Sequence, residues 1–251
     1  DCHMYQNDSV LIKLDKKRGA EFKTQGIKDE IVRTVYFSEK VRYHLCEPNV
    51  LLLDRAAFSL NGGEYCPEEE ILKIDNICRT RLGYPLRSEN FPQPWVVDEE
   101  KILNYVCLKF IMNSVTDIEG GFLAVENAEN LSIRFNSQTV ENKVDGYFTD
   151  HAIKTVALPK ILKGKNILEL KIPFGKRDNL EWCYILGKFN VRVEGAECVL
   201  EKATDSVGFS DLTAQGMPFY GGNIVYETEI ETPQCDMLIH TVNYRGALVK
   251  V

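Results

Sequence analysis

The fold class is decided by Tyr105-Val-Cys-Leu-Lys-Phe-Ile111 and by a later counterpart, Ile167-Leu-Glu-Leu-Lys-Ile172. In both stretches apolar side chains recur at every second position, which is the period of a β-strand with one buried face. The same period recurs in other short segments bounded by turn formers: Val10–Leu14, Ile31–Phe37, Val41–Leu45, Leu131–Phe135 and Val191–Val193. Strands without intervening helices predict antiparallel sheets, and therefore an all-β protein with a jelly-roll β-sandwich.

One segment has helical spacing instead. Its apolar residues recur three or four positions apart: Ile71, Ile74, Ile77, Cys78 and Leu82. Pro67 suits the first turn of a helix, the acidic run 68–70 suits its positive end, and Gly83 suits its termination. Arg79 and Arg81 favour the negative end of the helix dipole. We therefore expect one amphipathic helix over residues 67–82, inserted in the β fold and covering one face or end of the sandwich.

The composition and charge of the chain limit the classes of partner that are expected. The 251 residues carry 30 Lys+Arg against 37 Asp+Glu, a net charge of −7. Nucleic acid is not expected as a partner, because phosphate contacts need clustered cations. No apolar run is long enough for a membrane helix, so no membrane partner is expected either. The first five residues lack the pattern of a secretory signal, and the eight scattered cysteines predict mostly free thiols, so we expect a cytoplasmic protein.

The stretch Leu158-Pro-Lys-Ile-Leu-Lys-Gly-Lys-Asn-Ile-Leu-Glu-Leu170 resembles the Leu-x-x-Gly-x-Asn-x-Leu-x-Leu ending of galactose-binding-like jelly rolls. Gly164 allows a left-handed turn residue, Asn166 can bond the loop backbone, and Leu168 and Leu170 point to one core face. Sugar-binding domains of this type accompany glycoside hydrolases of family 2 and bacterial rhamnosidases.

Three further stretches, Glu47–Asp54, Pro173–Gly187 and Asp211–Asn223, resemble uncharacterised bacterial glycoside-hydrolase-like proteins over about residues 40–251. Such sandwiches lie beside a catalytic barrel, and this chain shows no barrel-like βα alternation. The resemblance thus implies a non-catalytic carbohydrate-binding or substrate-positioning region. Its partners would be carbohydrate and a catalytic glycoside hydrolase domain of the same polypeptide. The chain departs from the pattern at Asn136-Ser137, where Asn-Gly is the commoner turn.

The expected organisation has three parts. Residues 1–39 form an N-terminal β-rich segment, and residues 40–204 form the galactose-binding-like sandwich. Residues 205–251 form the start of a second, truncated β-sandwich module. The last part rests on a partial internal repeat, because residues 224–251 resemble the opening of the first sandwich at 105–136. We expect residues 205–251 to dock on the first sandwich through Phe209, Phe219 and Tyr220.

Sugar binding needs exposed aromatic faces beside carboxylates, amides or arginines. Three clusters have this composition. The first is a proline-rich loop with Gln93 and Trp95. The second and third contribute the remaining sugar-binding candidates: Arg177, Asn179, Glu181, Trp182, Tyr184, Gln215, Tyr220 and Asn223. The alternative for each cluster is structural, with the aromatic rings packed between domains and the amides bonded to buried backbone.

Catalysis is not expected from this chain alone, although Glu181 beside Trp182 is a weak candidate for a general acid, with Glu47 and Asp54 as other possibilities. No cofactor is expected. Asp145 and Asp150 flank a turn that could hold a structural calcium ion, with a solvated turn as the alternative. Two other functions stay open: a purely structural module that braces a catalytic barrel, and a free-standing glycosidase.

Overall fold

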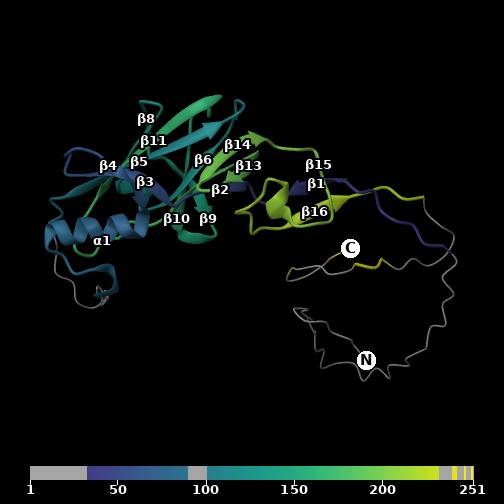
Figure 1. The fold of residues 1–251 in the computed structure, drawn as a ribbon, viewed down its shortest axis with the longest axis horizontal. Coiled ribbons are helices and arrows are strands. Elements are labelled where there is room, and N and C mark those ends of the chain that lie inside the picture. Colours follow the sequence, from purple (N-terminus) through teal and green to yellow (C-terminus); the bar gives the residue numbers. More distant parts are fainter. Residues whose placement is uncertain (1–32, 90–100, 232–238, 242–245, 247–249, 251) are drawn as a thin grey trace, which may run out of the picture. The chain divides into compact units, whose positions relative to one another are not determined.

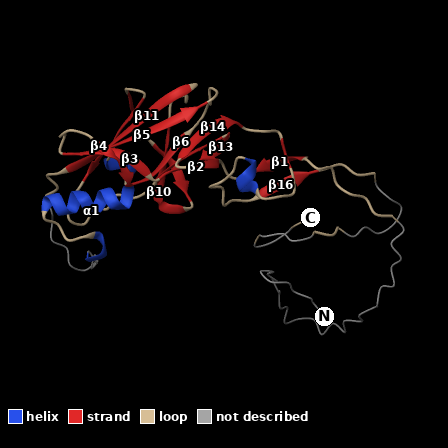
Figure 2. Cartoon of the chain, in the orientation of Figure 1, coloured by secondary structure: helices blue, strands red, loops and turns tan. Residues whose placement is uncertain are grey.

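The computed structural model describes residues 33–89, 101–231, 239–241, 246 and 250 (Figure 1). Ser38–Thr228 form one compact unit, and the described residues outside it carry no helix or strand. The expected strand Ile31–Phe37 is therefore wrong over residues 33–37, which the structure describes as neither helix nor strand. The expected strand Val10–Leu14 lies outside the described residues. The compact unit is mostly β, and α1 is the one α-helix in the described ranges (Figure 2).

A five-stranded sheet has the strand order β2-β12-β6-β10-β9, and all its pairs are antiparallel. Its strands are β2 (Asn49–Leu53), β6 (Phe122–Glu126), β9 (Val144–Phe148), β10 (Asp150–Ala157) and β12 (Cys183–Gly187). Strands far apart in sequence are brought together here, since β2 pairs with β12 over its whole length.

The larger sheet has the order β13-β14-β5-β11-β7-β8, with β3 paired to β5 and β4 paired to β3. Its strands are β3 (Arg55–Leu60), β4 (Cys66–Glu70), β5 (Tyr105–Ser114), β7 (Ser132–Phe135), β8 (Gln138–Val140), β11 (Gly164–Pro173), β13 (Phe189–Glu194) and β14 (Glu197–Lys202). The two stretches that decide the fold class are neighbours in it, because β5 and β11 pair antiparallel over ten residues each. The short contact between β14 and β5 is parallel, so the sheet is not purely antiparallel.

The two sheets share one hydrophobic core. The larger sheet contributes Phe110, Ile133 and Leu168, and the five-stranded sheet contributes Leu123 and Ile185, each at most 1% exposed. In each strand these residues alternate with outward-facing ones, as the period of two requires. The predicted β class with packed antiparallel sheets is therefore confirmed.

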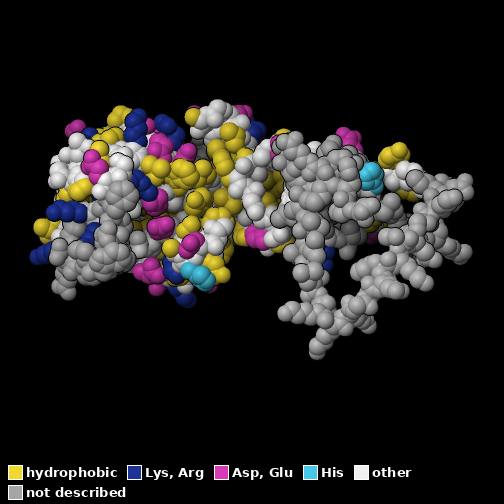
Figure 3. All heavy atoms as spheres, turned by 90° about the horizontal axis from the view of Figure 1, so that it is seen from below, with side chains coloured by type: hydrophobic (Ala, Val, Ile, Leu, Met, Phe, Trp, Pro, Cys, Tyr) yellow, Lys and Arg dark blue, Asp and Glu magenta, His cyan; other side chains and the backbone are white. Residues whose placement is uncertain are grey.

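The outer face of the five-stranded sheet carries a second, smaller cluster. Val50, Ala124 and Leu186 are buried there beneath half-buried side chains: Phe122, Phe148, Ile153, Tyr184 and Phe219. Figure 3 shows hydrophobic side chains gathered on the side of the molecule where β9 and β10 lie. The sheet thus buries apolar side chains on both faces.

The predicted helix is confirmed in α1 (Ile71–Leu82), but it begins four residues later than expected. Pro67 lies in β4 instead, because the segment 66–70 pairs with β3. Glu70 then caps the helix, accepting hydrogen bonds from the backbone N–H groups of Leu72 and Lys73 at 3.1 Å each. Gly83 ends the helix in a left-handed conformation with φ of 67°, as predicted. α1 packs beside β3 and β4.

The motif at the start of β11 takes the predicted conformation. Gly164 has a φ of 97°, and Leu168 and Leu170 are buried. Asn166 is fully buried, and its amide donates to the carbonyl of Leu162 at 2.7 Å while its Oδ1 accepts from the Leu162 N–H at 2.9 Å. One side chain therefore satisfies the backbone of the loop that precedes the strand.

The hairpin between β7 and β8 closes without glycine. Asn136 and Ser137 have φ values of 47° and 66°, so both central residues are left-handed, as a type I′ turn requires. Asn136 is held in place because its Oδ1 accepts from the Ile167 N–H at 2.8 Å and its Nδ2 donates to Asn166 Oδ1 at 2.8 Å. These tertiary bonds offset the preference of that turn for Asn-Gly.

A three-stranded sheet joins the two ends of the compact unit, in the order β15-β1-β16. Its strands are β1 (Val41–Leu45), β15 (Ser206–Val207) and β16 (Ile224–Glu227). The chain between β15 and β16 is tied to the sandwich by the carbonyl of Gly216, which accepts from the Val191 N–H at 2.8 Å and from the Asn49 side chain at 2.9 Å. Phe219 packs against both hydrophobic clusters, whereas Phe209 is 52% exposed and contacts the Tyr226 ring. The expected domain boundaries at 39/40 and 204/205 stay predictions.

The six described cysteines form no disulfide with one another, and two of them, Cys78 and Cys183, are buried. No helix in the described ranges is long and apolar enough to cross a membrane.

Candidate functional site

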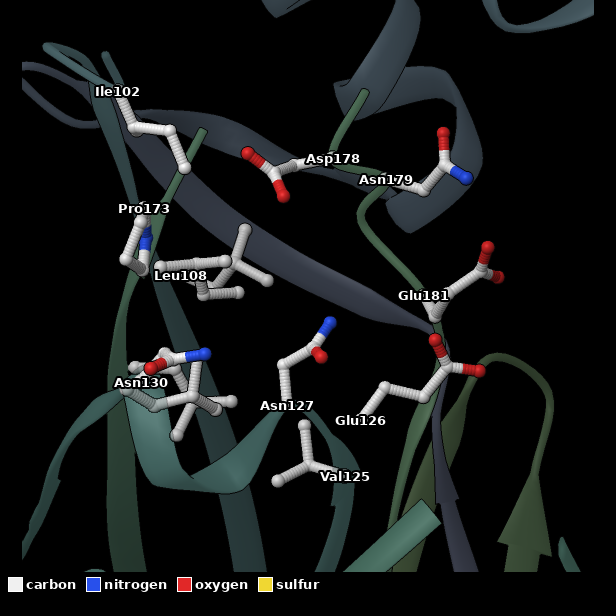
Figure 4. A pocket seen from close by; sticks show the side chains of 13 residues that line it. Ile102, Leu108, Val125, Glu126, Asn127, Asn130, Pro173, Asp178, Asn179 and Glu181 are labelled. Atoms are coloured by element: carbon white, nitrogen blue, oxygen red, sulfur yellow. The ribbon is translucent and has the colours of Figure 1, made fainter. Parts of the chain in front are cut away.

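A cavity of about 350 Å³ lies where β6 and β11 end, beside the loop 174–182 that joins β11 to β12 (Figure 4). Its apolar wall is formed by strand residues and by two residues that lie outside the strands, Ile102 and Leu131. The strand residues are Leu108, Val125, Leu170, Ile172 and Pro173. Its polar wall is formed at strand ends and in loops: Glu126, Asn127, Asn130, Asp178, Asn179 and Glu181. The cavity thus combines an aliphatic surface with carboxylates and amides, the usual composition of a small-molecule site.

Two carboxylates approach each other at one side of this cavity, where Figure 4 shows Glu126 and Glu181 side by side. Burial raises the pKa of Glu126, and the nearby charges of Glu181 and Asp150 raise it further. Glu181 forms an ion pair with Arg87. The two acids therefore differ in environment, since Glu181 has a cationic partner and the Glu126 side chain has no hydrogen bond to any described residue.

Asn127 precedes the short η2 helix (Ala128–Asn130) that follows β6, and Asn130 is the last residue of that helix. Asn127 takes a left-handed conformation with φ of 52°, and its side chain does not cap the helix. Neither amide side chain bonds to a described residue, so both are available to a ligand.

The loop 174–182 is held in place by a buried arginine. Arg79 of α1 is fully buried and forms an ion pair with Asp75, one turn earlier on the helix, which is also fully buried. Its guanidinium donates to the carbonyls of Lys176, at 2.9 Å, and Asp178, and to Asn179 Oδ1 at 3.0 Å. The Asp75 carboxylate in turn accepts the Leu180 N–H at 2.7 Å. The helix therefore fixes the part of the polar wall that the loop 174–182 contributes.

The aromatic members of the second predicted cluster do not line the cavity. Trp182 is 40% exposed, and its indole N–H donates at 2.9 Å to Glu70, the residue that caps α1. Tyr184 lies in the outer cluster of the five-stranded sheet, with its ring 5.2 Å from that of Phe148. Arg177 is exposed in the loop. Of this cluster, the structure brings only Asn179 and Glu181 to the cavity.

The polar side chains of the third predicted cluster form hydrogen bonds within the protein. The Gln215 side chain accepts from the Gly208 N–H at 2.7 Å and donates to the carbonyl of the same residue at 3.2 Å. Glu47 accepts from the backbone N–H of Asn223 at 2.7 Å and from its side chain at 2.8 Å. The Tyr220 hydroxyl lies 2.8 Å from Glu47 Oε2. The contacts of Glu47 join the chain after β15 to the turn between β1 and β2.

Glu47→Gln is expected to lower the midpoint of thermal unfolding at pH 7 by about 2–4 °C, equivalent to about 1 kcal/mol. The Asn223 N–H groups hold the pKa of Glu47 below its ordinary value of 4.5. A depressed folded-state pKa means that the charged form stabilises the fold above pH 4.5, and that this contribution is lost as the pH falls through the folded pKa. The difference between variant and wild type should therefore shrink between pH 5 and pH 3 in calorimetry.

Glu64→Gln, in the exposed turn between β3 and β4, is the control for this measurement. It should leave the midpoint unchanged at every pH. A Glu47→Gln difference that stayed constant with pH would contradict the role assigned to the carboxylate.

The remaining candidates stand apart from the cavity. Gln93 and Trp95 lie outside the described residues. Asp145 lies within β9, whereas Asp150 begins β10 and accepts the Ala152 N–H at 2.8 Å. Among the residues that the structure describes, no group of three or more His, Cys, Asp or Glu side chains is placed to hold a metal ion.

The sequence interpretation did not identify Glu126, Asn127 and Asn130 as site residues. One signal could have found them, because polar residues that directly follow an apolar strand often lie at a sheet edge, and Glu126-Asn127 ends the run Phe122-Leu-Ala-Val. No local signal marks Arg79 as buried, since three of its partners lie 97 to 100 residues away.

Comparisons with known proteins give a weak structural likeness. No protein-family model matches the chain, and no curated protein matches it. Among solved structures, the chain is similar to a GH31 alpha-xylosidase from Xanthomonas citri, with 11% identity and a TM-score of 0.28. The likeness covers 66% of this chain and 18% of the xylosidase. A TM-score of this size does not establish a shared fold.

Proposed function

We propose that this chain is a non-catalytic, carbohydrate-binding region of a glycoside hydrolase, built on a galactose-binding-like jelly roll. The cavity beside the loop 174–182 is its sugar site. Support for the fold comes from the resemblance at Leu158–Leu170 and from the packed antiparallel sheets, in which Gly164 and Asn166 take the roles that this motif implies.

One observation supports the sugar site: an aliphatic wall lies beside polar side chains that form no hydrogen bond with the described residues. Sugar hydroxyls both donate and accept hydrogen bonds, whereas the C–H faces of a pyranose ring pack on apolar surface. The Glu126 carboxylate can accept from two hydroxyls, and the amides of Asn127 and Asn130 can donate and accept. Because Arg79 holds Asp178 and Asn179 of the same polar wall, the site is largely formed before any ligand binds.

The test is sugar binding by variants of this wall. We expect a glycan array to give selective hits with the wild type, and we expect Glu126→Gln and Asn127→Ala each to weaken the best hit about tenfold in calorimetry, as the loss of a hydrogen bond to a charged or buried group predicts. Neither substitution should lower the thermal stability, because neither side chain bonds to the described residues and Glu126→Gln removes a charge that burial and neighbouring acids disfavour. Glu129→Gln is the matched control, since Glu129 is exposed in the same η2 segment and does not line the cavity.

The second candidate function is a structural module that braces a catalytic domain and binds no sugar. It is favoured because four of the predicted sugar-binding side chains already form hydrogen bonds within the protein: Trp182, Asn179, Gln215 and Tyr220. A wild-type chain that is folded and binds nothing on the array at millimolar sugar would support this candidate against the first.

A further inference from the structure

The outer face of the larger sheet carries a group of cations that is separate from the cavity. Alternation along β5 and β11 turns Leu108 and Leu170, which line the cavity, toward the core. Their strand neighbours Lys109 and Lys171 therefore point outward, and so does Arg134, which lies between two buried residues of β7. The three cations thus lie on the face of the sheet opposite to these two leucines.

Strand register places the cations beside one carboxylate. In one row across the sheet, Glu169 of β11 lies opposite Lys109 of β5 and opposite Arg134 of β7. In the next row, about 7 Å further along β11, Lys171 lies opposite Ser132. The Glu169 carboxylate is 3.7 Å from the Lys109 ammonium and 3.9 Å from the Arg134 guanidinium, so both ion pairs are longer than a hydrogen bond.

This face has more positive charge than its carboxylate balances. Within the described part of the chain, Lys171 is exposed and has no carboxylate within ion-pair distance, whereas Glu169 is shared by two cations. Lys160 shows the opposite arrangement, because it pairs with both Asp117 and Glu119. Three cations against one carboxylate make the face positive in a chain whose net charge is −7, which favours an anionic partner.

Two tyrosine rings lie among these cations. The Lys109 ammonium is 4.0 Å from the centroid of the Tyr65 ring, and the Lys171 ammonium is 3.8 Å from that of the Tyr105 ring. A hollow of about 390 Å³ lies beside the second pair, and its lining includes Tyr105, Ser132 and Lys171. A ring beside a cation supplies the two groups that an acidic sugar needs: apolar surface for its C–H face and a charge for its carboxylate.

We propose that the outer face of the larger sheet binds an acidic polysaccharide, whose uronate carboxylates pair with Lys171, Arg134 and Lys109. This surface is a second site, beyond the function proposed for the cavity. A repeating polyanion fits it because the cations occupy two rows of an extended face rather than one pocket. The ammonium of Lys171 moves from the Tyr105 ring to a carboxylate, which leaves that ring to pack on a sugar unit. Nucleic acid fits less well, because three cations neutralise few of its closely spaced phosphates.

The experiment measures binding of three polymers to the whole chain by isothermal titration calorimetry at low salt: polygalacturonate, its methyl ester, and polyphosphate. The methyl ester has the same sugar units without the negative charge, and polyphosphate has the charge without the sugar. We expect polygalacturonate to bind about tenfold more tightly than either of the others. Added salt should weaken its binding, because the ion pairs form at an exposed surface.

Four substitutions locate the surface. Lys171→Gln and Arg134→Gln should each weaken polygalacturonate binding about fivefold, because each removes a cation that pairs with a carboxylate. Glu169→Gln should strengthen binding by about the same factor, because it removes the carboxylate that competes for Lys109 and Arg134. A loss of folding cannot produce this gain. Lys188→Gln, which removes an exposed charge between β12 and β13, is the matched control and should have no effect.

Each contrary result overturns the assignment. Equal binding of polygalacturonate and its methyl ester would show that the surface does not recognise carboxylates. Equal binding of polyphosphate would indicate a site for polyanions of any class. If Lys171→Gln and Glu169→Gln both behave like the control, polygalacturonate binds elsewhere on the chain. A folded wild type that binds none of the polymers would remove this partner, whereas the function of the cavity is tested separately by neutral sugars and Glu126→Gln.

Discussion

Arg79→Met is expected to lower the free energy of unfolding by about 3–5 kcal/mol, as the removal of one partner from a buried ion pair does. Among the described residues, the substitution leaves the fully buried Asp75 with Arg87 as its remaining cation, whose guanidinium is 3.8 Å away. It also removes the donor from the carbonyls of Lys176 and Asp178. The measurement is urea denaturation followed by tryptophan fluorescence, with Trp182 in the loop that Arg79 holds.

Lys73→Met is the matched control, because it removes from the same helix an exposed cation, which pairs with the half-buried Glu69. Its effect should stay within about 1 kcal/mol. Adding Asp75→Asn to Arg79→Met should recover part of the lost stability, since the unpaired buried charge is removed while an acceptor for the Leu180 N–H remains. An Arg79→Met chain as stable as the control would show that the network does not hold the loop.

Ile74→Asp is expected to cost at least about 4 kcal/mol, because it loses a buried aliphatic side chain and buries a charge without a partner. Ile74 is fully buried in the main core, beside Ile71 and Cys78 of the same helix. The expected result is a chain that is largely unfolded, or whose midpoint of thermal unfolding is at least about 8–16 °C lower in calorimetry. Ile74→Val, which keeps the apolar surface, should cost only about 0.5–1.5 kcal/mol. Equal midpoints for Ile74→Asp and wild type would refute the packing of α1 on the sandwich.

Local periodicity was sufficient for α1 and for five of the sixteen strands that the structure describes: β1, β5, β7, β11 and β13. Alternation predicted β5 and β11, and the spacing of Ile71, Ile74 and Cys78 predicted α1. Gly164 and Asn166 took their expected roles because both are local, involving a left-handed residue and bonds within four positions. The start of α1 was not predicted, because Pro67 fits a first helical turn equally well. Residues 66–70 form a strand because they pair with β3, and this contact depends on the tertiary fold.

The candidate site was harder to predict, because its residues come together from three separate parts of the chain. Residue types suggested sugar contacts at Trp182 and Gln215, yet the protein itself bonds both side chains, to Glu70 and to Gly208. The sequence pattern assigns Arg79 to the helix dipole, whereas its five hydrogen-bond partners include three in the loop 174–182. Composition identifies groups able to bind a ligand, but it does not show which of them the fold has already used.

The pairing of β2 with β12 has a consequence for synthesis on the ribosome. β2 is an apolar strand that ends at Leu53, and its partner begins only at Cys183. At about 5–20 residues per second, the nascent chain carries this unpaired strand for roughly 6–26 s before the partner is translated. The β1 strand waits longer, since β16 lies at residues 224–227. Closure of the sandwich is therefore a late step, and until the partner strand is made the emerging polypeptide exposes an unpaired apolar strand.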